Sequence, residues 1–306
     1  MSQVSPSENA IEIRGLRKHF PSFDLGPLDM TIPRGSIYGF VGPNGAGKST
    51  TIDLIFGMGR AEAGTISVCG LDHEADEVAM KRRTAYVSPE LEYSQWGRIH
   101  KAARFIRGFY PDTWDDAHFQ ELIDHFGLEL DAKIATLSFG SKTKLAICLA
   151  LARRPEVLIL DEPTTGLDAI AKQELFTQLL ALVQDSSRTI LISSHSLSDV
   201  ERFADHLGII RDGVMLHEGP IHEIVERYCL VDFTTVEETD YVCGEGMTLI
   251  RQEKNRIRVL ADRQTEALTA LAGQSVEDVN ESPVTLEDLF VSLLKKPRSG
   301  TSCPQA

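Results

Sequence analysis

The sequence predicts an α/β fold in which crossover helices connect the strands of a parallel β-sheet. Short apolar runs alternate with helical patterns from residue 11 to about residue 215. Three runs are apolar throughout, as strands covered on both faces must be: IYGFV (37–41), VLIL (157–160) and TILIS (189–193). Each run ends at glycine or polar residues. Because ligands of open α/β sheets bind beyond the carboxyl ends of the strands, functional residues are expected directly after each run.

Length and hydropathy limit the class of protein. The 306 residues suit one large domain, or a domain with an appendage. No apolar run approaches the roughly 20 residues that a membrane-spanning helix needs. The polar start MSQVSPSENA lacks the apolar centre of a signal peptide. We therefore expect a cytoplasmic chain with a flexible N-terminus over residues 1–10.

Charge and cysteine usage exclude further classes. With 45 Asp and Glu against 31 Lys and Arg, the formal net charge is −14, which disfavours nucleic acid as a partner because its phosphates would be repelled. The five cysteines are scattered and show no CxxC spacing, which argues against a zinc site and a disulfide framework. Reduced thiols are expected.

A phosphate-binding loop is predicted directly after the first apolar run. GPNGAGKST (42–50) follows IYGFV and precedes the helical run TIDLIFG, so the G-x-x-x-x-G-K-[ST] pattern lies in its strand–loop–helix context. This context disfavours the alternative, a purely structural glycine turn. Glycines let backbone N–H groups face inward, and the helix N-terminus adds its positive end to the same anion site. The predicted nucleotide-binding residues of this loop are Gly42, Asn44, Gly45, Ala46, Gly47, Lys48, Ser49 and Thr50.

Two of these loop residues have particular roles in this interpretation. Lys48 would bridge the β- and γ-phosphates of the nucleotide, and Ser49 would be a ligand of Mg²⁺. Both roles belong to the side chains, whereas the glycines contribute backbone N–H groups.

An aromatic, helical insert is expected over about residues 91–140. In WDDAHFQELIDHF (114–126) four apolar residues share one helix face: Phe119, Leu122, Ile123 and Phe126. The segment LSFGSKTK (137–144) follows and admits two interpretations. Ser138 can be an ordinary helix cap, or the segment can be half of a nucleotide site completed by another polypeptide. Phe139 and Gly140 stand where a helix would favour alanine, so a cap alone does not explain them.

Two adjacent carboxylates follow the second apolar run. Asp161 stands at the end of VLIL, where it can hold Mg²⁺ through water, and Glu162 can polarise an attacking water molecule. The alternative is a solvated turn before a helix capped by Asp168. An apolar strand that points two acids toward a P-loop makes that alternative the weaker one.

A histidine follows the third apolar run. SSHSLSD (193–199) places His195 at the same edge of the sheet as the two carboxylates. A single histidine is more often structural, but here it could hydrogen-bond the γ-phosphate and orient the water held by Glu162. The predicted catalytic residues are Glu162, His195 and Lys48.

A small α+β accessory region is expected over residues 231–296, with a disordered tail over 297–306. TLIRQEKNRIRVL reads as a hairpin around Lys254 and Asn255, and ALTALAG and VTLEDLFVSLL read as helices. The sequence gives this region a fold texture and little more; a regulatory or dimer-supporting role is our expectation for it.

The motifs of residues 11–215 together resemble those of the ATP-binding subunit of ABC transporters. In that family GPNGAGKST corresponds to the Walker A loop, VLILDEP to the Walker B strand with Glu162 as catalytic base, and GLD to the D-loop with Asp168. His195 corresponds to the switch histidine, and LSFGS falls where the family has its signature sequence. The resemblance implies a P-loop ATPase domain over residues 11–230 that uses ATP and Mg²⁺.

The resemblance also implies partners. Two ATPase domains would pair head to tail, either two copies of this chain or this chain and a homologous subunit. Each ATP would then lie between the P-loop of one chain and the signature helix of the other, so that Ser138, Gly140 and Asp168 are ATP-binding residues. A separate membrane-spanning permease is implied, with export favoured over import, and a peripheral location on the cytoplasmic face of the inner or plasma membrane.

The chain departs from the family pattern at the signature and at the glutamine of the Q-loop. The signature usually reads LSGGQ, and here Phe139 and Ser141 replace a glycine and the glutamine. In YVSPELEYSQW (86–96) Glu90 stands at the position of the Mg²⁺-binding glutamine, and a carboxylate can still bind this oxygen-preferring cation. The predicted Mg²⁺ ligands are therefore Ser49, Glu90 and Asp161, with Gln95 as a substitute for Glu90.

Adenine recognition is assigned to an aromatic residue before the P-loop. Phe20 in LRKHF is predicted to stack on the base, with Phe23 behind it. The alternative is that Phe20 belongs to the hydrophobic core.

Two other function classes fit the sequence less well. A soluble ABC-type ATPase acting on nucleic acid or ribosomes would usually carry two ATPase domains or a long coiled coil, and this sequence has neither. A P-loop kinase or GTPase would leave LSFGS and His195 unexplained, and the sequence lacks the N-K-x-D guanine reader.

Overall fold

The computed structural model describes residues 8–88, 93–183, 188–236, 241–273 and 275–294. The chain divides into two compact units, Met1–Glu218 and Gly219–Ala306. The predicted tail and most of the predicted flexible N-terminus lie outside the described residues.

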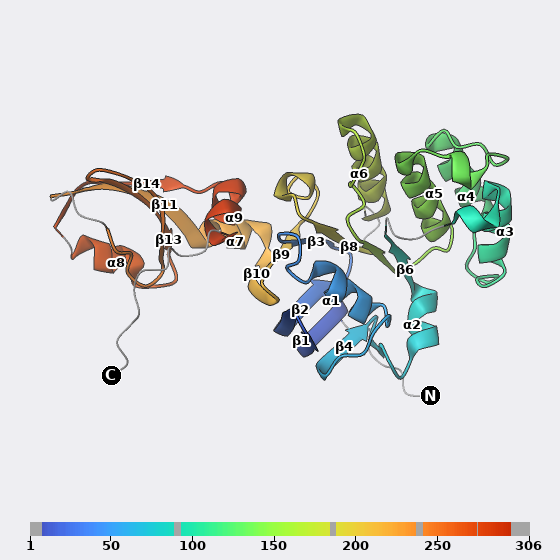
Figure 1. The fold of residues 1–306 in the computed structure, drawn as a ribbon, viewed down its shortest axis with the longest axis horizontal. Helices are drawn as coiled ribbons and strands as arrows, with labels where there is room; N and C mark the ends of the chain where they lie inside the picture. Colours follow the sequence, from blue (N-terminus) through green and yellow to red (C-terminus); the bar gives the residue numbers. More distant parts are fainter. Residues whose placement is uncertain (1–7, 89–92, 184–187, 237–240, 274, 295–306) are drawn as a thin grey trace. The chain divides into compact units, whose positions relative to one another are not determined.

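The main sheet of the first unit has the strand order β10-β9-β3-β8-β7-β6 (Figure 1). β3 pairs in parallel with β8 and β9, and β7 pairs in parallel with β8 and β6, as the sequence predicted. The three apolar runs form β3, β7 and β8, which are buried along their whole length. The strands are β3 (Ile37–Val41), β6 (Thr84–Val87), β7 (Val157–Leu160), β8 (Thr189–Ser194), β9 (His206–Arg211) and β10 (Val214–Pro220).

A second, antiparallel sheet, which the sequence analysis did not predict, has the order β2-β1-β4-β5. β1 and β2 are joined by a turn at Pro21 and Ser22, and such a short connection forces antiparallel pairing. Burial alternates along β1, which is typical of a sheet with one solvated face. The strands are β1 (Asn9–Phe20), β2 (Phe23–Pro33), β4 (Ala63–Val68) and β5 (Leu71–Asp72).

One hydrophobic core joins the two sheets through helix α1 (Lys48–Ile55). It contains Ile13 and Met30 from the antiparallel sheet, Ile52 from α1, and Phe40 from β3, all fully buried. Because α1 begins at the P-loop lysine, this packing fixes the loop relative to both sheets.

The helices of the insert lie beside β6 (Figure 1). α5 packs against β6 and α4. Phe119, Leu122, Ile123 and Phe126 are all buried, as their shared helix face predicted. The helical elements between β5 and β7 are α2 (Glu77–Arg83), η1 (Ser94–Trp96), α3 (Ile99–Arg107), α4 (Asp116–His125), η2 (Ile134–Thr136) and α5 (Phe139–Leu151).

The second unit contains a four-stranded sheet of order β12-β13-β11-β14 with its own hydrophobic core. The predicted hairpin is present, with Lys254 in the left-handed region at φ 54° between β12 and β13. Both predicted helices are present as α8 and α9. The elements are α7 (Ile221–Arg227), β11 (Tyr228–Thr235), β12 (Met247–Glu253), β13 (Arg256–Asp262), α8 (Ala267–Ala272), β14 (Val276–Pro283) and α9 (Leu286–Leu294).

Two expectations from composition concern the described part of the chain. None of the helices within it is long and apolar enough to span a membrane. Its cysteines are free thiols, and burial raises the pKa of the Cys148 thiol to about 12, which keeps it protonated and unreactive.

Candidate nucleotide-binding site

The P-loop turns from β3 into α1 at positions where only glycine fits. Gly47 is the N-cap of α1 with φ 107°, in the left-handed region. A Cβ atom at Gly42 would lie 2.2 Å from the carbonyl oxygen of Ile210 in β9. The backbone of the loop therefore lies closely against the sheet, which leaves its N–H groups available to an anion.

Lys48 is held inside the loop. Its side chain is only 5% exposed, and Nζ donates to the carbonyl oxygens of Gly42 at 2.8 Å and Pro43 at 3.2 Å. Nζ also lies 3.3 Å from Oε1 of Glu162. A cation thus stands between the P-loop and the predicted base.

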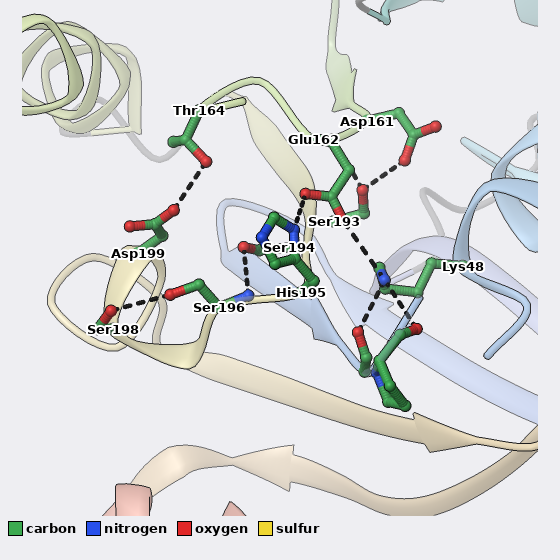
Figure 2. A network of polar contacts seen from close by, with 12 residues as sticks. Lys48, Asp161, Glu162, Thr164, Ser193, Ser194, His195, Ser196, Ser198 and Asp199 are labelled. Atoms are coloured by element: carbon green, nitrogen blue, oxygen red, sulfur yellow. Dashed lines mark hydrogen bonds and ion pairs between the residues drawn. The ribbon is translucent and has the colours of Figure 1, made fainter. Parts of the chain in front are cut away.

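Asp161 and Glu162 lie just beyond β7, and Ser193 of the neighbouring strand β8 connects them. The Ser193 hydroxyl donates to Asp161 Oδ1 and accepts a hydrogen bond from the backbone N–H of Glu162 at 2.9 Å (Figure 2). Asp161 is 5% exposed and Ser193 is fully buried. The strand pairing of β7 and β8 brings these residues together.

Glu162 and His195 form a hydrogen-bonded pair at the mouth of the site. His195 Nδ1 lies 2.7 Å from Glu162 Oε2 (Figure 2). Since a carboxylate only accepts, Nδ1 carries the proton and Nε2 is left for another partner. Glu162 has φ 47°, an unusual left-handed conformation for a residue other than glycine.

A cleft of about 690 Å³ lies over these residues. Phe20 and Phe23 stand at its side with ring centroids 6.2 Å apart, and Lys18 Nζ lies 5.5 Å from the Phe20 ring centroid. Phe23 packs against the hydrophobic core, whereas Phe20 is absent from that cluster, so the cleft is the better description of its place. The lining residues are Phe20, Ser22, Phe23, Asn44, Gly45, Gly47, Lys48, Ser49, Thr50, Glu162, Thr165 and His195.

The start of α5, which carries the predicted signature residues, is not part of the described lining of this cleft. Ser138 is the N-cap, and its hydroxyl accepts from the backbone N–H of Ser141 at 3.1 Å. The adjacent Phe139 is 45% exposed, and its ring lies against Gly166. Within the part of the chain that the structure describes, no lining residue of the cleft comes from 138–141.

Two further residues predicted to bind nucleotide or metal are Asp168 and Glu90. Asp168 caps α6 (Ala169–Val183) through a hydrogen bond to its Oδ1 from the backbone N–H of Ala171 at 2.8 Å. Glu90, the predicted Mg²⁺ ligand, lies outside the described residues, and its substitute Gln95 belongs to η1.

Sequence reasoning missed a polar cluster behind the predicted base. Asp199 Oδ2 accepts from the Thr164 hydroxyl at 2.8 Å, and Lys172 Nζ lies within 3.0 Å of both oxygens of Asp199. It also missed the role of Ser193. The spacing of Ser193 and Asp161 after neighbouring apolar runs was the available signal, but it becomes informative only when β7 and β8 are known to pair.

The comparisons with known proteins agree with this geometry. Residues 25–165 match the family described as ABC transporter. The chain is 34% identical over 300 residues to the Nod factor export ATP-binding protein I of Burkholderia lata, covering 92% of this chain and 96% of that protein. The chain belongs to the family of ABC transporter ATP-binding subunits. It is therefore a nucleotide-binding ATPase, and the predicted α/β P-loop fold is confirmed.

Other relatives of this ABC subunit extend the comparison. It is 34% identical over 229 residues to the bacitracin transport ATP-binding protein BcrA of Bacillus licheniformis, covering 74% of this chain and 73% of that protein. A solved ATP-binding subunit of an ABC transporter superposes with a TM-score of 0.62 at 27% identity, covering 71% of this chain and 92% of that one. The cbiO1 structure from Clostridium perfringens, described as part of the cbiONQ transporter complex, shares the fold at 24% identity and a TM-score of 0.60, covering 71% of this chain and 91% of that one.

Proposed function

We propose that this subunit hydrolyses Mg·ATP between two head-to-tail copies and thereby powers export through a separate membrane-spanning subunit. The observation that carries the proposal is the convergence of Lys48, Glu162 and His195 on one cleft, with contacts of 2.7 Å and 3.3 Å to the Glu162 carboxylate. The name of the Nod factor relative, an export ATP-binding protein, favours export over import.

Different residues of the cleft would have different roles in the reaction. P-loop N–H groups and Lys48 would bind the β- and γ-phosphates, and Phe20 would stack on the adenine. Glu162 would accept a proton from the attacking water, and His195 Nε2 would contact the γ-phosphate. The hydrogen bond between His195 and Glu162 keeps the two groups in one geometry.

The donor groups near the P-loop fit Mg²⁺. Ser49, an exposed residue in the first turn of α1, supplies a hydroxyl, and Asp161 supplies a buried carboxylate oriented by Ser193. Mg²⁺ prefers oxygen ligands and usually takes one or two from protein, with phosphates and water completing its shell. When bound, the ion neutralises charge on the phosphates; no described cluster of three His, Cys, Asp or Glu competes as a metal site.

The dimer is supported by a site that one copy leaves incomplete. Ser138, Phe139 and Gly140 start a helix whose N-terminus is suited to an anion, yet none of these residues lines the described cleft. In a head-to-tail pair the helix start of one copy would close the cleft of the other. Two ATP molecules would then hold the dimer together until hydrolysis releases it.

The aromatic insert is the proposed contact with the membrane subunit. Trp96, Phe105 and Phe109 form a chain of rings with centroid separations of 4.9 Å and 5.1 Å. Phe105 is 50% exposed and Phe109 is 62% exposed. Exposed aromatic clusters mark interaction sites. We assign this cluster to the permease, which would place the subunit on the cytoplasmic face of the membrane.

The test is copurification from native membranes. A tagged full chain should bring one hydrophobic chain with it, and Phe105→Ala together with Phe109→Ala should release that chain while the ATPase rate of the free subunit stays unchanged.

Chelation of divalent cations should abolish hydrolysis, and added Mg²⁺ should restore it. A chain that recovers only soluble partners, such as ribosomes, would contradict the transport function and favour a non-transport ATPase.

A further inference from the structure

A partly buried carboxylate connects the two loops that carry Glu162 and His195. Asp199 ends the short helix η3 (Leu197–Asp199) that follows His195, and its side chain is 12% exposed. Its Oδ2 accepts from the Thr164 hydroxyl at 2.8 Å (Figure 2). The same oxygen lies 2.8 Å from Lys172 Nζ. Thr164 belongs to the loop that begins with Glu162, and Lys172 belongs to α6 beyond it.

The contacts of Asp199 are of a kind that fixes position. Thr164 is 3% exposed, so its hydroxyl has little access to water and depends on this acceptor. Lys172 reaches both oxygens of the carboxylate, at 3.0 Å and 2.8 Å, and such charge-assisted hydrogen bonds are short and directional. A partly buried carboxylate that loses either donor would be left uncompensated.

The hydrogen bond between Glu162 and His195 lies between two such connections. On one side, Ser193 joins the ends of β7 and β8 through Asp161 and the Glu162 N–H. On the other side, Asp199 joins the loop after Glu162 to the turn after His195. Figure 2 shows the two connections on either side of the Glu162–His195 pair, so a shift of either loop would strain at least one of them.

We propose that Asp199 is a positioning residue. It holds His195 against Glu162 and fixes the loop after Glu162 relative to the turn after His195. This inference rests on the catalytic roles proposed above for Glu162 and His195. Asp199 lines no part of the described cleft and needs no contact with nucleotide to act in this way. Its effect should therefore appear in the chemical step and not in ATP binding.

The experiment measures steady-state ATP hydrolysis by the full chain carrying Asp199→Ala. We expect kcat to fall by about 10-fold to about 100-fold with KM for ATP little changed, as for other residues that orient a catalytic group. Asp199→Asn keeps an acceptor for Thr164 and should recover part of the loss. Ser198→Ala is the matched control on the same turn, and it should hydrolyse ATP at the wild-type rate. Among the described residues, the hydrogen-bond partner of the Ser198 hydroxyl is Ser196, on the same turn.

A double-mutant cycle separates positioning from a general loss of structure. In a His195→Ala background, Asp199→Ala should lower kcat little further, because the residue acts through His195. Fully multiplicative losses would overturn the inference. If Asp199→Ala does not fold, Thr164→Val replaces it as the test, because this change removes one hydroxyl and keeps the shape of the side chain. A wild-type kcat in Thr164→Val would also overturn the inference.

The outcomes distinguish this inference from the proposed function. A wild-type kcat in Asp199→Ala, combined with a loss in His195→Ala, overturns the positioning role alone. Wild-type rates in both variants overturn the catalytic role of His195, and the positioning role falls with it.

Discussion

At the scale of single residues, the site is organised by hydroxyl groups as much as by charges. The Ser193 hydroxyl connects the predicted metal ligand with the backbone of the predicted base. Its full burial means that no water molecule replaces it easily.

Ser193→Ala tests this organisation. We expect the variant to fold and bind nucleotide but to hydrolyse ATP about 10-fold more slowly and to require more Mg²⁺, because Asp161 loses the donor that orients it. Steady-state hydrolysis across a Mg²⁺ titration is the measurement. Ser196→Ala, on an adjacent hydroxyl that pairs with Ser198, is the control; equal behaviour of the two variants would contradict the role of Ser193.

The catalytic residues could be predicted, but their supports could not. Lys48, Glu162 and His195 each follow an apolar run, and the rule that ligands collect at strand ends places them together. Ser193 and Asp199 depend on which strands are neighbours and in what register, because their partners lie 32 and 35 positions away in the sequence. No local pattern contains that information.

At the scale of elements, β7 is anchored at its beginning by an ion pair. Glu156 receives a bidentate contact from Arg83 at 2.5 Å and 2.6 Å, and Arg34 lies 3.3 Å away. The hydrogen bonds from Arg83 lower the pKa of the Glu156 carboxyl below its ordinary value, although partial burial opposes them. The contact fixes the strand that delivers Asp161 to the site.

This lowered pKa predicts how stability depends on pH. A carboxyl whose folded pKa is lowered contributes stability above its unfolded pKa of about 4.3, and that contribution is lost as pH falls through the folded pKa. Glu156→Gln should thus be less stable than wild type at pH 7, by about 1 kcal/mol or less because the side chain is partly exposed, and the difference should shrink below about pH 4. Urea unfolding at several pH values measures it.

The control for that series is Glu129→Gln, on an exposed residue. This variant should have the same free energy of unfolding as wild type at every pH of the series. A Glu156→Gln deficit that grows on acidification would contradict the direction of the pKa change.

The start of α5 distinguishes a structural cap from a functional one. Ser138 and Asp115 both cap helices through a backbone N–H three positions later. Replacing either with alanine should cost about 1 kcal/mol of stability. Only Ser138→Ala should also lower ATP hydrolysis by 10-fold or more, since only that helix start is proposed to contact the nucleotide of a partner. Equal activity of the two variants in hydrolysis assays would leave Ser138 as a plain cap.

Elements were predicted well where their burial pattern is uniform and poorly where it alternates. β3, β7 and β8 were recognised because both faces are covered. The antiparallel sheet of β1, β2, β4 and β5 was not recognised, because strands with one solvated face interrupt the apolar runs. The turn at Pro21 and Ser22 was the missed sign of a hairpin.

At the scale of the whole molecule, the two units have separate cores. We expect a chain ending at Pro220, which keeps β10, to bind ATP as the full chain does, because the cleft residues all belong to the first unit. Its tendency to dimerise should be weaker if the second unit supports the pair. Nucleotide affinity and sedimentation of both chains are the measurements, and unchanged dimerisation with unchanged hydrolysis would rule out that supporting role.

The central claim is that ATP is enclosed between two copies of this subunit or its homologue. The most direct measurement is the mass in solution of the full chain carrying Glu162→Gln, by light scattering during gel filtration with and without Mg·ATP. Because this variant should bind ATP and fail to hydrolyse it, a dimer is expected with Mg·ATP and a monomer without it, and adding Ser138→Ala should weaken that dimer. A strictly monomeric, nucleotide-loaded Glu162→Gln variant at high protein concentration, alone and with its membrane subunit, would contradict the claim.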